Sequence, residues 1–311
     1  MRNYKEVFDL IHKEIGKVVV GQKEMVDQIL IALLCDGNVL IEGYPGLAKT
    51  LTVKTIAEII DLKFARIQAT PDLMPSDITG TFIIDDTHGK RAFKFQEGPV
   101  FTNILLADEI NRATPKSQSA LLEAMQEKQV TVGNQTFKLD PPFFVLATQN
   151  PIEQEGTYPL PEAQADRFLL KVRAEYPTEE EEKIIVDRFT EISGERKVRK
   201  ILNKERILFL QKKVLEMPVA NDLKGKAISI ILETRKNKSL IEYGASPRAS
   251  LAIILASKAR ALINGRNHVA SEDITTMAYP VLRHRIILNF EAERRGMSVD
   301  DAITEIMKKA K

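Results

Sequence analysis

The sequence has a single cysteine, Cys35, no tryptophan and only four histidines. One cysteine cannot form a disulfide within the chain, which predicts a reducing compartment such as the cytoplasm. No residue beside Cys35 would lower the pKa of its thiol, so we expect a packed side chain rather than a nucleophile. The histidines lack the spacing of metal ligands and are expected in surface or packing positions. They are His12, His88, His268 and His284.

Neither an excess of one charge nor a long apolar run is present. Lysine and arginine number 45 and aspartate and glutamate 43, a net charge of +2, so we expect no nucleic-acid or membrane footprint. No apolar run is long enough to span a bilayer, and the first 17 residues are charged throughout, unlike a signal peptide. With 311 residues, 44% of them hydrophobic, we expect a globular protein of two domains without membrane insertion.

The first half of the chain alternates strand-like apolar runs with helix-like stretches. The strand-like runs are residues 38–42, 64–68, 104–108, 143–149 and 167–172. Helical patterns lie between them, at residues 49–60 and after Thr114, which forms a helix start with Pro115. Strands separated by helices predict an α/β fold with a mostly parallel sheet, covered by helices on both faces.

Two stretches interrupt this alternation. Residues 80–98 have two strand-like arms around His88–Gly89, and residues 128–140 have alternating arms around Gly133–Asn134. Turn residues of this kind between alternating arms are typical of β-hairpins. We therefore expect two β-hairpins inserted into the α/β core.

From residue 178 onward, helical patterns dominate the sequence. The predicted helices are residues 178–191, 203–217, 222–237, 247–264, 271–282 and 298–310. The polar segment 193–200, SGERKVRK, is typical of a linker. The sequence thus predicts an α/β nucleotide-binding domain over residues 1–193 and an all-α domain over residues 194–311.

The stretch from Gly43 to Thr50, GYPGLAKT, nearly matches a phosphate-binding loop. A strand-like run precedes it and a helical run follows, which is the context that such a loop requires. Backbone N–H groups would bind the phosphates, Lys49 would reach the β- and γ-phosphates, and the Thr50 hydroxyl would bind Mg²⁺. The pattern therefore predicts a nucleotide site, against the alternative of a strand–turn–helix that merely contains these letters.

Ala48 stands where the pattern has its last glycine. Glycine is required only where φ is positive or where a side chain would clash. Ala48 directly precedes the helix, where we expect φ to be negative already, and Pro45 and Gly46 supply the tight turn. Alanine is therefore predicted to be compatible with a working loop.

Residues 104–109, ILLADE, form an apolar run that ends in two adjacent acids. Carboxylates at the end of a buried strand are costly unless they meet a cation. Asp108 is therefore predicted to hold Mg²⁺, and Glu109 to polarise the attacking water. The alternative, a solvated turn with two acids, is disfavoured by the phosphate-loop pattern in the same chain.

Three further polar residues are weaker candidates on their own. Asn150 ends a strand and can orient water or the γ-phosphate, although Asn–Pro also starts turns. Arg167 is either a finger directed at a neighbouring subunit's γ-phosphate or a surface partner of Asp166 or Glu162. Arg248, in the first turn of a helix, opposes the helix dipole, which favours an anionic partner such as a phosphate.

Taken together, these residues resemble the MoxR family of AAA+ ATPases. The matching segments, within about residues 18–250, are VVVGQ, GYPGLAKT, RIQATPDLMPSDITG, EGPVFTNILLADEINRATPKSQSALLEAMQEKQVT, ATQNPIEQEGTYPLPEAQADRF and GASPRAS. The family's loop also carries alanine before its lysine, so the resemblance implies a working site. It further implies an AAA+ P-loop core with a five-stranded parallel sheet, an all-α lid, and hairpins that correspond to the helix-2 and pre-sensor-1 inserts.

The resemblance also implies roles for individual residues. The Walker B acids are Asp108 and Glu109, sensor 1 is Asn150, the arginine finger is Arg167, and sensor 2 is Arg248, acting either in cis or in trans because the lid is relocated. Lys49 and Thr50 are the Walker A residues, and Val19 and Val20 lie on the adenine side. The full set of implied nucleotide-binding residues is Val19, Val20, Gly43, Pro45, Gly46, Leu47, Ala48, Lys49, Thr50 and Leu51. The implied cofactors are ATP or ADP with Mg²⁺.

The function expected on this basis is ATP hydrolysis by a hexameric ring that remodels or matures partner proteins. The family implies a client protein and, in some members, a partner with a von Willebrand factor A domain. An alternative is a nucleic-acid motor, supported only by the basic arm HGKRAFK at residues 88–94. A regulatory subunit without turnover is disfavoured, because Glu109 is present.

Overall fold

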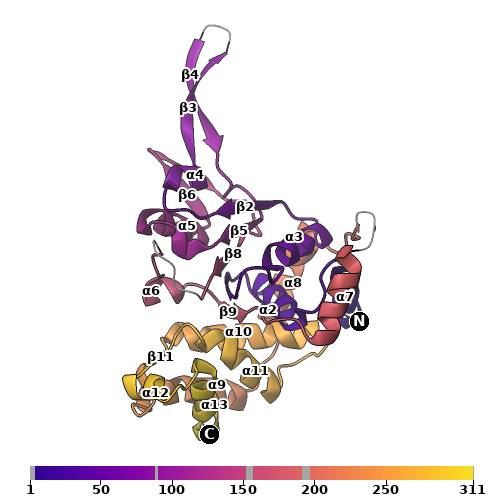
Figure 1. The fold of residues 1–311 in the computed structure, drawn as a ribbon, viewed down its shortest axis with the longest axis vertical. Helices are drawn as coiled ribbons and strands as arrows, with labels where there is room; N and C mark the ends of the chain where they lie inside the picture. Colours follow the sequence, from indigo (N-terminus) through magenta and orange to yellow (C-terminus); the bar gives the residue numbers. More distant parts are fainter. Residues whose placement is uncertain (1–3, 88–89, 152–156, 191–196, 311) are drawn as a thin grey trace.

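The computed structural model describes residues 4–87, 90–151, 157–190 and 197–310. Figure 1 shows an α/β core, a long β-hairpin that projects from one end of it, and a layer of helices at the opposite end. The predicted α/β fold with a helical C-terminal region is confirmed.

The core is built on one five-stranded sheet in the order β2-β5-β8-β1-β9, and all of its strands are parallel. The strands are β1 (Val39–Glu42), β2 (Phe64–Gln68), β5 (Ile104–Asp108), β8 (Phe144–Gln149) and β9 (Leu170–Arg173). Every residue of β5 is buried, because helices cover both faces of the sheet, and this is why the strand is a continuous apolar run. β9 begins three residues later than the predicted strand at residues 167–172.

Seven α-helices accompany this sheet in the described residues up to 190. They are α1 (Tyr4–Ile15), α2 (Lys23–Leu34), α3 (Lys49–Ile59), α4 (Pro75–Thr79), α5 (Pro115–Glu127), α6 (Glu162–Ala165) and α7 (Glu179–Thr190). α5 begins directly after Thr114, as predicted. Cys35, which ends α2, packs against the core, and burial raises the pKa of its thiol, in agreement with a packing role.

Both predicted hairpins are present. β3 (Gly80–Thr87) pairs with β4 (Lys90–Glu97), and this ribbon projects in Figure 1; β6 (Gln129–Val132) pairs with β7 (Gln135–Lys138). Gly133 turns the second hairpin with a φ of +60°, while the predicted turn at residues 88–89 lies outside the described residues. The hairpins are joined by aromatic packing, because the rings of Phe95 and Phe137 stack 4.1 Å apart.

The C-terminal region is helical, with two additions that the sequence patterns did not predict, the short helix α12 and a two-stranded ribbon. Its helices are α8 (Lys204–Glu216), α9 (Asn221–Lys236), α10 (Pro247–Ile263), α11 (Ser271–Leu282), α12 (Phe290–Arg294) and α13 (Val299–Lys309). β10 (Ile241–Tyr243) and β11 (Ile287–Leu288) form an antiparallel ribbon, so the all-α prediction is wrong at this point. Strands of two or three residues are too short to show a period of two.

The lid helices and the core share one apolar cluster. It joins α1, α2 and α3 with α8 through α11, and α10 lies against α2. The predicted boundary between residues 193 and 194, and the first half of the predicted linker, lie outside the described residues. The division into domains at 1–193 and 194–311 stays a prediction.

Two absences can be stated for the described parts of the chain. None of their helices is both long enough and apolar enough to cross a membrane. No group of three or more histidine, cysteine, aspartate and glutamate side chains is placed there to hold a metal ion.

A buried ion-pair group stabilises the lid. Burial alone would raise the pKa of Asp273, but bonds from Arg266, the Ala270 N–H and Arg260 hold it below its usual value. This stabilisation is present above the ordinary carboxyl pKa and is lost as the pH falls through the lowered pKa. Asp273→Asn should therefore lower the free energy of unfolding by about 3 kcal/mol, measured by urea denaturation.

The matched control for this prediction is Glu272→Gln. Glu272 binds the same Arg260 but its side chain is 72% exposed, so the expected change is at most about 0.5 kcal/mol. Equal effects of the two variants would contradict a special role for the buried carboxylate.

Candidate functional site

A cavity of about 370 Å³ lies at the carboxyl ends of β1, β5 and β8. The polar residues predicted from three separate motifs converge on it. The lining comprises Gly43, Pro45, Gly46, Leu47, Ala48, Lys49, Thr50, Leu51, Asp108, Glu109, Thr148, Gln149 and Asn150. Ligands of open α/β sheets bind at this edge, so the fold places the loop, both acids and Asn150 where the sequence predicted a site.

The loop backbone differs from the prediction at Ala48. Its φ is +53°, in the left-handed region, so the expectation of a negative φ is wrong. The loop turns sharply immediately before α3 begins at Lys49, and a non-glycine residue in this conformation costs about 1 kcal/mol. Gly46, with a φ of +87°, supplies the earlier turn as expected. Gly43 is required for another reason, because an added Cβ would lie 2.8 Å from that of Ala174.

Lys49 is directed back onto its own loop. Its Nζ donates to the carbonyls of Gly43 and Tyr44, each at 2.7 Å. Burial lowers the pKa of the ammonium, and Asp108 and Glu109 oppose that shift. A phosphate at this position would offer the ammonium a charged partner in place of two neutral carbonyls.

Lys49→Ala should weaken ATP binding by about 10- to 100-fold, because charge-assisted bonds to phosphate are lost. The affinity can be measured by titration with a fluorescent ATP analogue. Lys54→Ala is the matched control, because Lys54 is exposed on the same helix and does not line the cavity. An unchanged ATP affinity in Lys49→Ala would contradict the assignment of residues 43–50 as a phosphate-binding loop.

Asp108 is the most densely bonded acid of the site. Its two carboxylate oxygens accept from Thr148 at 2.6 Å, from Thr50 at 3.3 Å and from Arg66 at 2.7 Å. The Thr50 hydroxyl and the Asp108 carboxylate are hard oxygen donors that face one another, which is the donor chemistry that Mg²⁺ takes. The residues present therefore fit a magnesium ion at this position.

Glu109 has an unusual backbone for an acidic residue. Its φ is +55° and its N–H donates to the Thr148 hydroxyl at 2.8 Å. Its carboxylate lies 3.0 Å from Arg112 and its side chain is 33% exposed. Strained backbone of this kind clusters at functional sites. The Thr148 bond fixes the backbone of Glu109, which lines the cavity together with Asn150.

Three residues of this network were missed by the sequence patterns: Thr148, Arg66 and Arg112. Arg66 bonds Asp108, Arg112 bonds Glu109, and Thr148 bonds both acids. Thr148 directly precedes the predicted strand end at Gln149, and Arg112 follows Glu109 by three residues, so spacing alone offered a weak signal. Arg66 is on β2, and only the pairing of β2 with β5 brings it to Asp108.

Arg167 and Arg248 do not line the cavity. Arg248 lies 2.8 Å from Asp166, which also accepts from Ser246 and Arg285. The alternative pairing of Arg167 with Asp166 or Glu162 is not formed. Arg167 is exposed, and its side chain has no hydrogen-bond or ion-pair partner among the described residues. It is therefore accessible to a neighbouring molecule.

Val19 and Val20, which were predicted to contact adenine, do not line this cavity. Val19 is 3% exposed and belongs to the apolar cluster, while Val20 is half-buried. Tyr44 of the loop is exposed and stacks on Tyr176 with the ring centroids 5.5 Å apart. The adenine-side roles of Val19 and Val20 stay predictions.

Comparison with known proteins agrees with this geometry. Residues 38–170 match the model of the ATPase family associated with various cellular activities, and residues 233–306 match that of an AAA lid domain. A Mycobacterium tuberculosis protein named chaperone MoxR1 is 45% identical, over 94% of this chain and 79% of the relative. The MoxR protein of Methylorubrum extorquens is 28% identical, over 98% and 95%.

A solved structure shares the whole architecture. It is the crystal structure of an inferred ATPase from Cytophaga hutchinsonii, 46% identical, with a TM-score of 0.92 over 99% of this chain and 95% of that chain. The identity to the MoxR relatives extends from the phosphate loop through the lid. The chain therefore belongs to the MoxR family of AAA+ ATPases.

Proposed function

We propose that the protein hydrolyses ATP to ADP and phosphate in a Mg²⁺-dependent reaction at the cavity of Lys49, Asp108 and Glu109. The observation that carries the proposal is the convergence of the loop, both acids and Asn150 on one cavity. The family model over residues 38–170 supports the same reaction class.

The proposed roles follow from where each group lies. The loop N–H groups and Lys49 bind the phosphates at the N-terminus of α3, where the helix dipole favours negative charge. Glu109 accepts a proton from the attacking water, and Asn150, which lines the cavity beside it, orients that water. Among the described residues, Asp108 is the other acid that lines this cavity, and it is already bound by Thr148, Thr50 and Arg66.

Thr50 and Asp108 would hold Mg²⁺. When bound, the ion would supply positive charge that stabilises the phosphates of ATP. Arg66 now bonds one oxygen of Asp108 at 2.7 Å, and its side chain is 46% exposed, so it has room to move away from that oxygen.

We further propose a ring of subunits, hexameric as in the AAA+ class, in which Arg167 acts on the neighbour's nucleotide. Arg167 is exposed and does not line the cavity of its own subunit. A finger supplied in trans stabilises charge on the transferred phosphoryl group. A head-to-tail contact repeated around an axis closes such a ring. We propose Arg248 as sensor 2. In the structure it pairs with Asp166 of its own subunit.

The ring's proposed output is chaperone-like remodelling of a client protein in the cytoplasm. The name of the Mycobacterium tuberculosis relative supports this class of output. The β3–β4 hairpin projects from the body and exposes Ile84 and Phe93, which suits contact with a client. A partner with a von Willebrand factor A domain is an additional proposal that rests on the family alone.

The test is the ATPase rate per subunit as a function of protein concentration. A shared site requires assembly, so the specific rate should rise steeply and then reach a plateau. A rate per subunit that is already at its plateau where sedimentation shows only monomers would contradict the shared site. Stimulation by added DNA in the same assay would instead support a nucleic-acid motor.

A further inference from the structure

The side chain of Arg285, just after α11, lies against the segment that carries Arg167. Its guanidinium donates to the backbone carbonyls of Asp166, Phe168 and Leu169, the last at 3.0 Å, and its Nε lies 2.7 Å from the Asp166 carboxylate. Only 1% of the Arg285 side chain is exposed. These bonds hold the chain on both sides of Arg167, whose own side chain projects into solvent.

The charge of Arg285 is retained in this buried position. Burial lowers the pKa of its guanidinium to about 10, and the Asp166 carboxylate opposes that shift, so the group is protonated at neutral pH. The same guanidinium donates to the Val281 carbonyl of α11 at 2.6 Å. A planar guanidinium offers its donors in a fixed fork, so it joins α11 rigidly to residues 166–169.

The two residues before Arg285 bind the same stretch of chain. His284 Nε2 lies 3.0 Å from the Phe168 carbonyl, and burial lowers the pKa of the imidazole well below its usual value. The neutral ring therefore donates from Nε2 to that carbonyl. Arg283 donates to the Lys171 carbonyl at 3.4 Å. Residues 283–285, which we call the lid triplet, thus contact residues 166–171 along their length.

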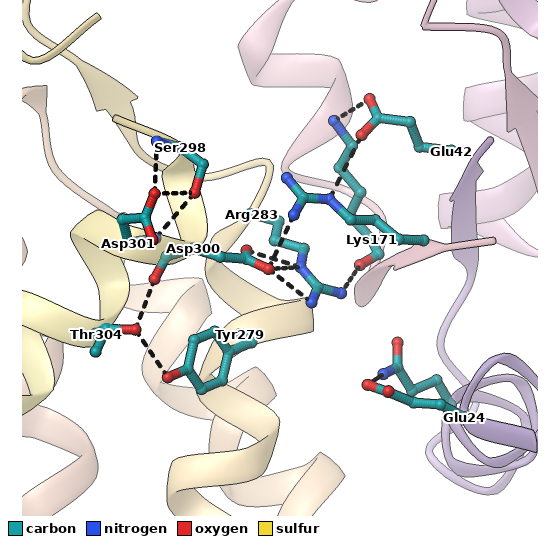
Figure 2. Close-up of polar contacts among 11 residues, drawn as sticks. Glu24, Glu42, Lys171, Tyr279, Arg283, Ser298, Asp300, Asp301 and Thr304 are labelled. Carbon is teal, nitrogen blue, oxygen red and sulfur yellow. Dashed lines mark hydrogen bonds and ion pairs between the residues drawn. The ribbon is translucent and has the colours of Figure 1, made fainter. Parts of the chain in front are cut away.

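The lid triplet is also connected to the base of the phosphate loop (Figure 2). Arg283 binds Asp300 of α13 at 2.9 Å, and Asp300 accepts from Arg173 at 2.9 Å. Lys171 lies 2.6 Å from Glu42, the residue that precedes the loop. The ion pairs therefore connect β1 and β9 with α11 and α13. They link the position of the lid to the phosphate loop, which follows β1, and to the segment 166–171, which leads into β9.

We propose that Arg285 is a positioning residue that holds residues 166–169 so that Arg167 reaches the nucleotide of the neighbouring subunit. The lid of one subunit thereby sets the hydrolysis rate at its neighbour's site. The inference rests on the proposed function, because it requires Arg167 to act between subunits. It goes beyond that function by assigning a role to a buried side chain that does not line the cavity.

The first test is Arg285→Lys, which keeps a positive charge near Asp166 but cannot bind three carbonyls in one fork. We expect kcat to fall about 10- to 100-fold, with nucleotide affinity and KM unchanged, because misplacing a catalytic group by about 1 Å has this effect. Arg295→Lys, at an exposed ion pair with Glu291, is the matched control and should retain the wild-type rate. Weakened nucleotide affinity in Arg285→Lys would overturn the proposal.

The second test mixes variants and separates a neighbour's site from a subunit's own. Glu109→Gln subunits retain Arg167 but lack the base, whereas Arg285→Lys subunits retain the base. The two variants are mixed 1:1 without nucleotide and then supplied with ATP. About a quarter of the interfaces then combine an intact base from one subunit with a positioned Arg167 from its neighbour, so the mixture should recover up to about a quarter of the wild-type rate. Arg285→Lys mixed with Arg167→Ala should recover nothing, since neither supplies a positioned finger.

A control mixture distinguishes this inference from the proposed function. Glu109→Gln with Arg167→Ala should recover activity if the site is shared at all. Recovery there but not with Arg285→Lys would overturn the role of Arg285 and leave the shared site standing. No recovery in either mixture would overturn the shared site and the inference with it. If Arg285→Lys does not fold, His284→Ala, which removes one bond to the Phe168 carbonyl, is carried through the same mixtures with the same expected recovery.

Discussion

Glu109→Gln is expected to bind ATP with wild-type affinity and to hydrolyse it about a thousandfold more slowly. An amide of the same shape cannot accept the proton of the attacking water. The fold should be preserved, because the backbone of Glu109 is held by its N–H bond to Thr148 and its side chain is one-third exposed. The rate is measured under single-turnover conditions, together with ATP affinity by fluorescence titration.

The matched control for Glu109→Gln is Glu123→Gln. Glu123 is exposed on α5 and does not line the cavity, so its loss should leave the rate unchanged. ATP that is bound but not hydrolysed should also keep the oligomer assembled, which light scattering would detect. Turnover by Glu109→Gln at the wild-type rate would show that the base lies elsewhere.

Arg167→Ala is expected to retain nucleotide binding and to lose about a thousandfold in kcat. Arg167 does not line the cavity of its own subunit, and its side chain is exposed without a partner among the described residues. Removing it therefore leaves the Lys49 site intact, while the neighbour's site loses a positive charge. The measurement is the kcat of assembled protein, with ATP affinity measured on the same samples.

The matched control for Arg167→Ala is Arg295→Ala. Arg295 is exposed in the lid and, among the described residues, pairs with Glu291, so both its kcat and its affinity should match the wild type. A loss of ATP affinity in Arg167→Ala would identify Arg167 as part of its own subunit's site or as a structural residue. The specific rate of Arg167→Ala should also stay low at every protein concentration.

Much of the fold and of the site could be predicted from local patterns. Most of the sheet strands are apolar runs, and polar site residues lie where two of them end: Asp108 is the last residue of β5, and Asn150 follows β8. Parallel strands bring their carboxyl ends to one edge of the sheet. The convergence of these residues therefore followed once the strands were identified.

The errors arose where the backbone or the pairing is set by more than local pattern. The positive φ of Ala48 follows from the course of the loop around the phosphate site and not from the residue type. The β10–β11 ribbon is stabilised by pairing between segments that lie on either side of α10 and α11. Neither feature has a period or a composition that a single stretch of sequence displays.

The sequence by itself determined the strand–loop–helix of the candidate phosphate site, the two acids at the end of β5 and the family, because these depend on residue type and spacing along a short stretch. The tertiary structure decided which charges meet. Asp166 pairs with Arg248 and Arg285, which are 82 and 119 residues away along the chain, rather than with its neighbour Arg167. An arginine pairs with whichever carboxylate packing brings within reach, and packing is a property of the whole folded chain.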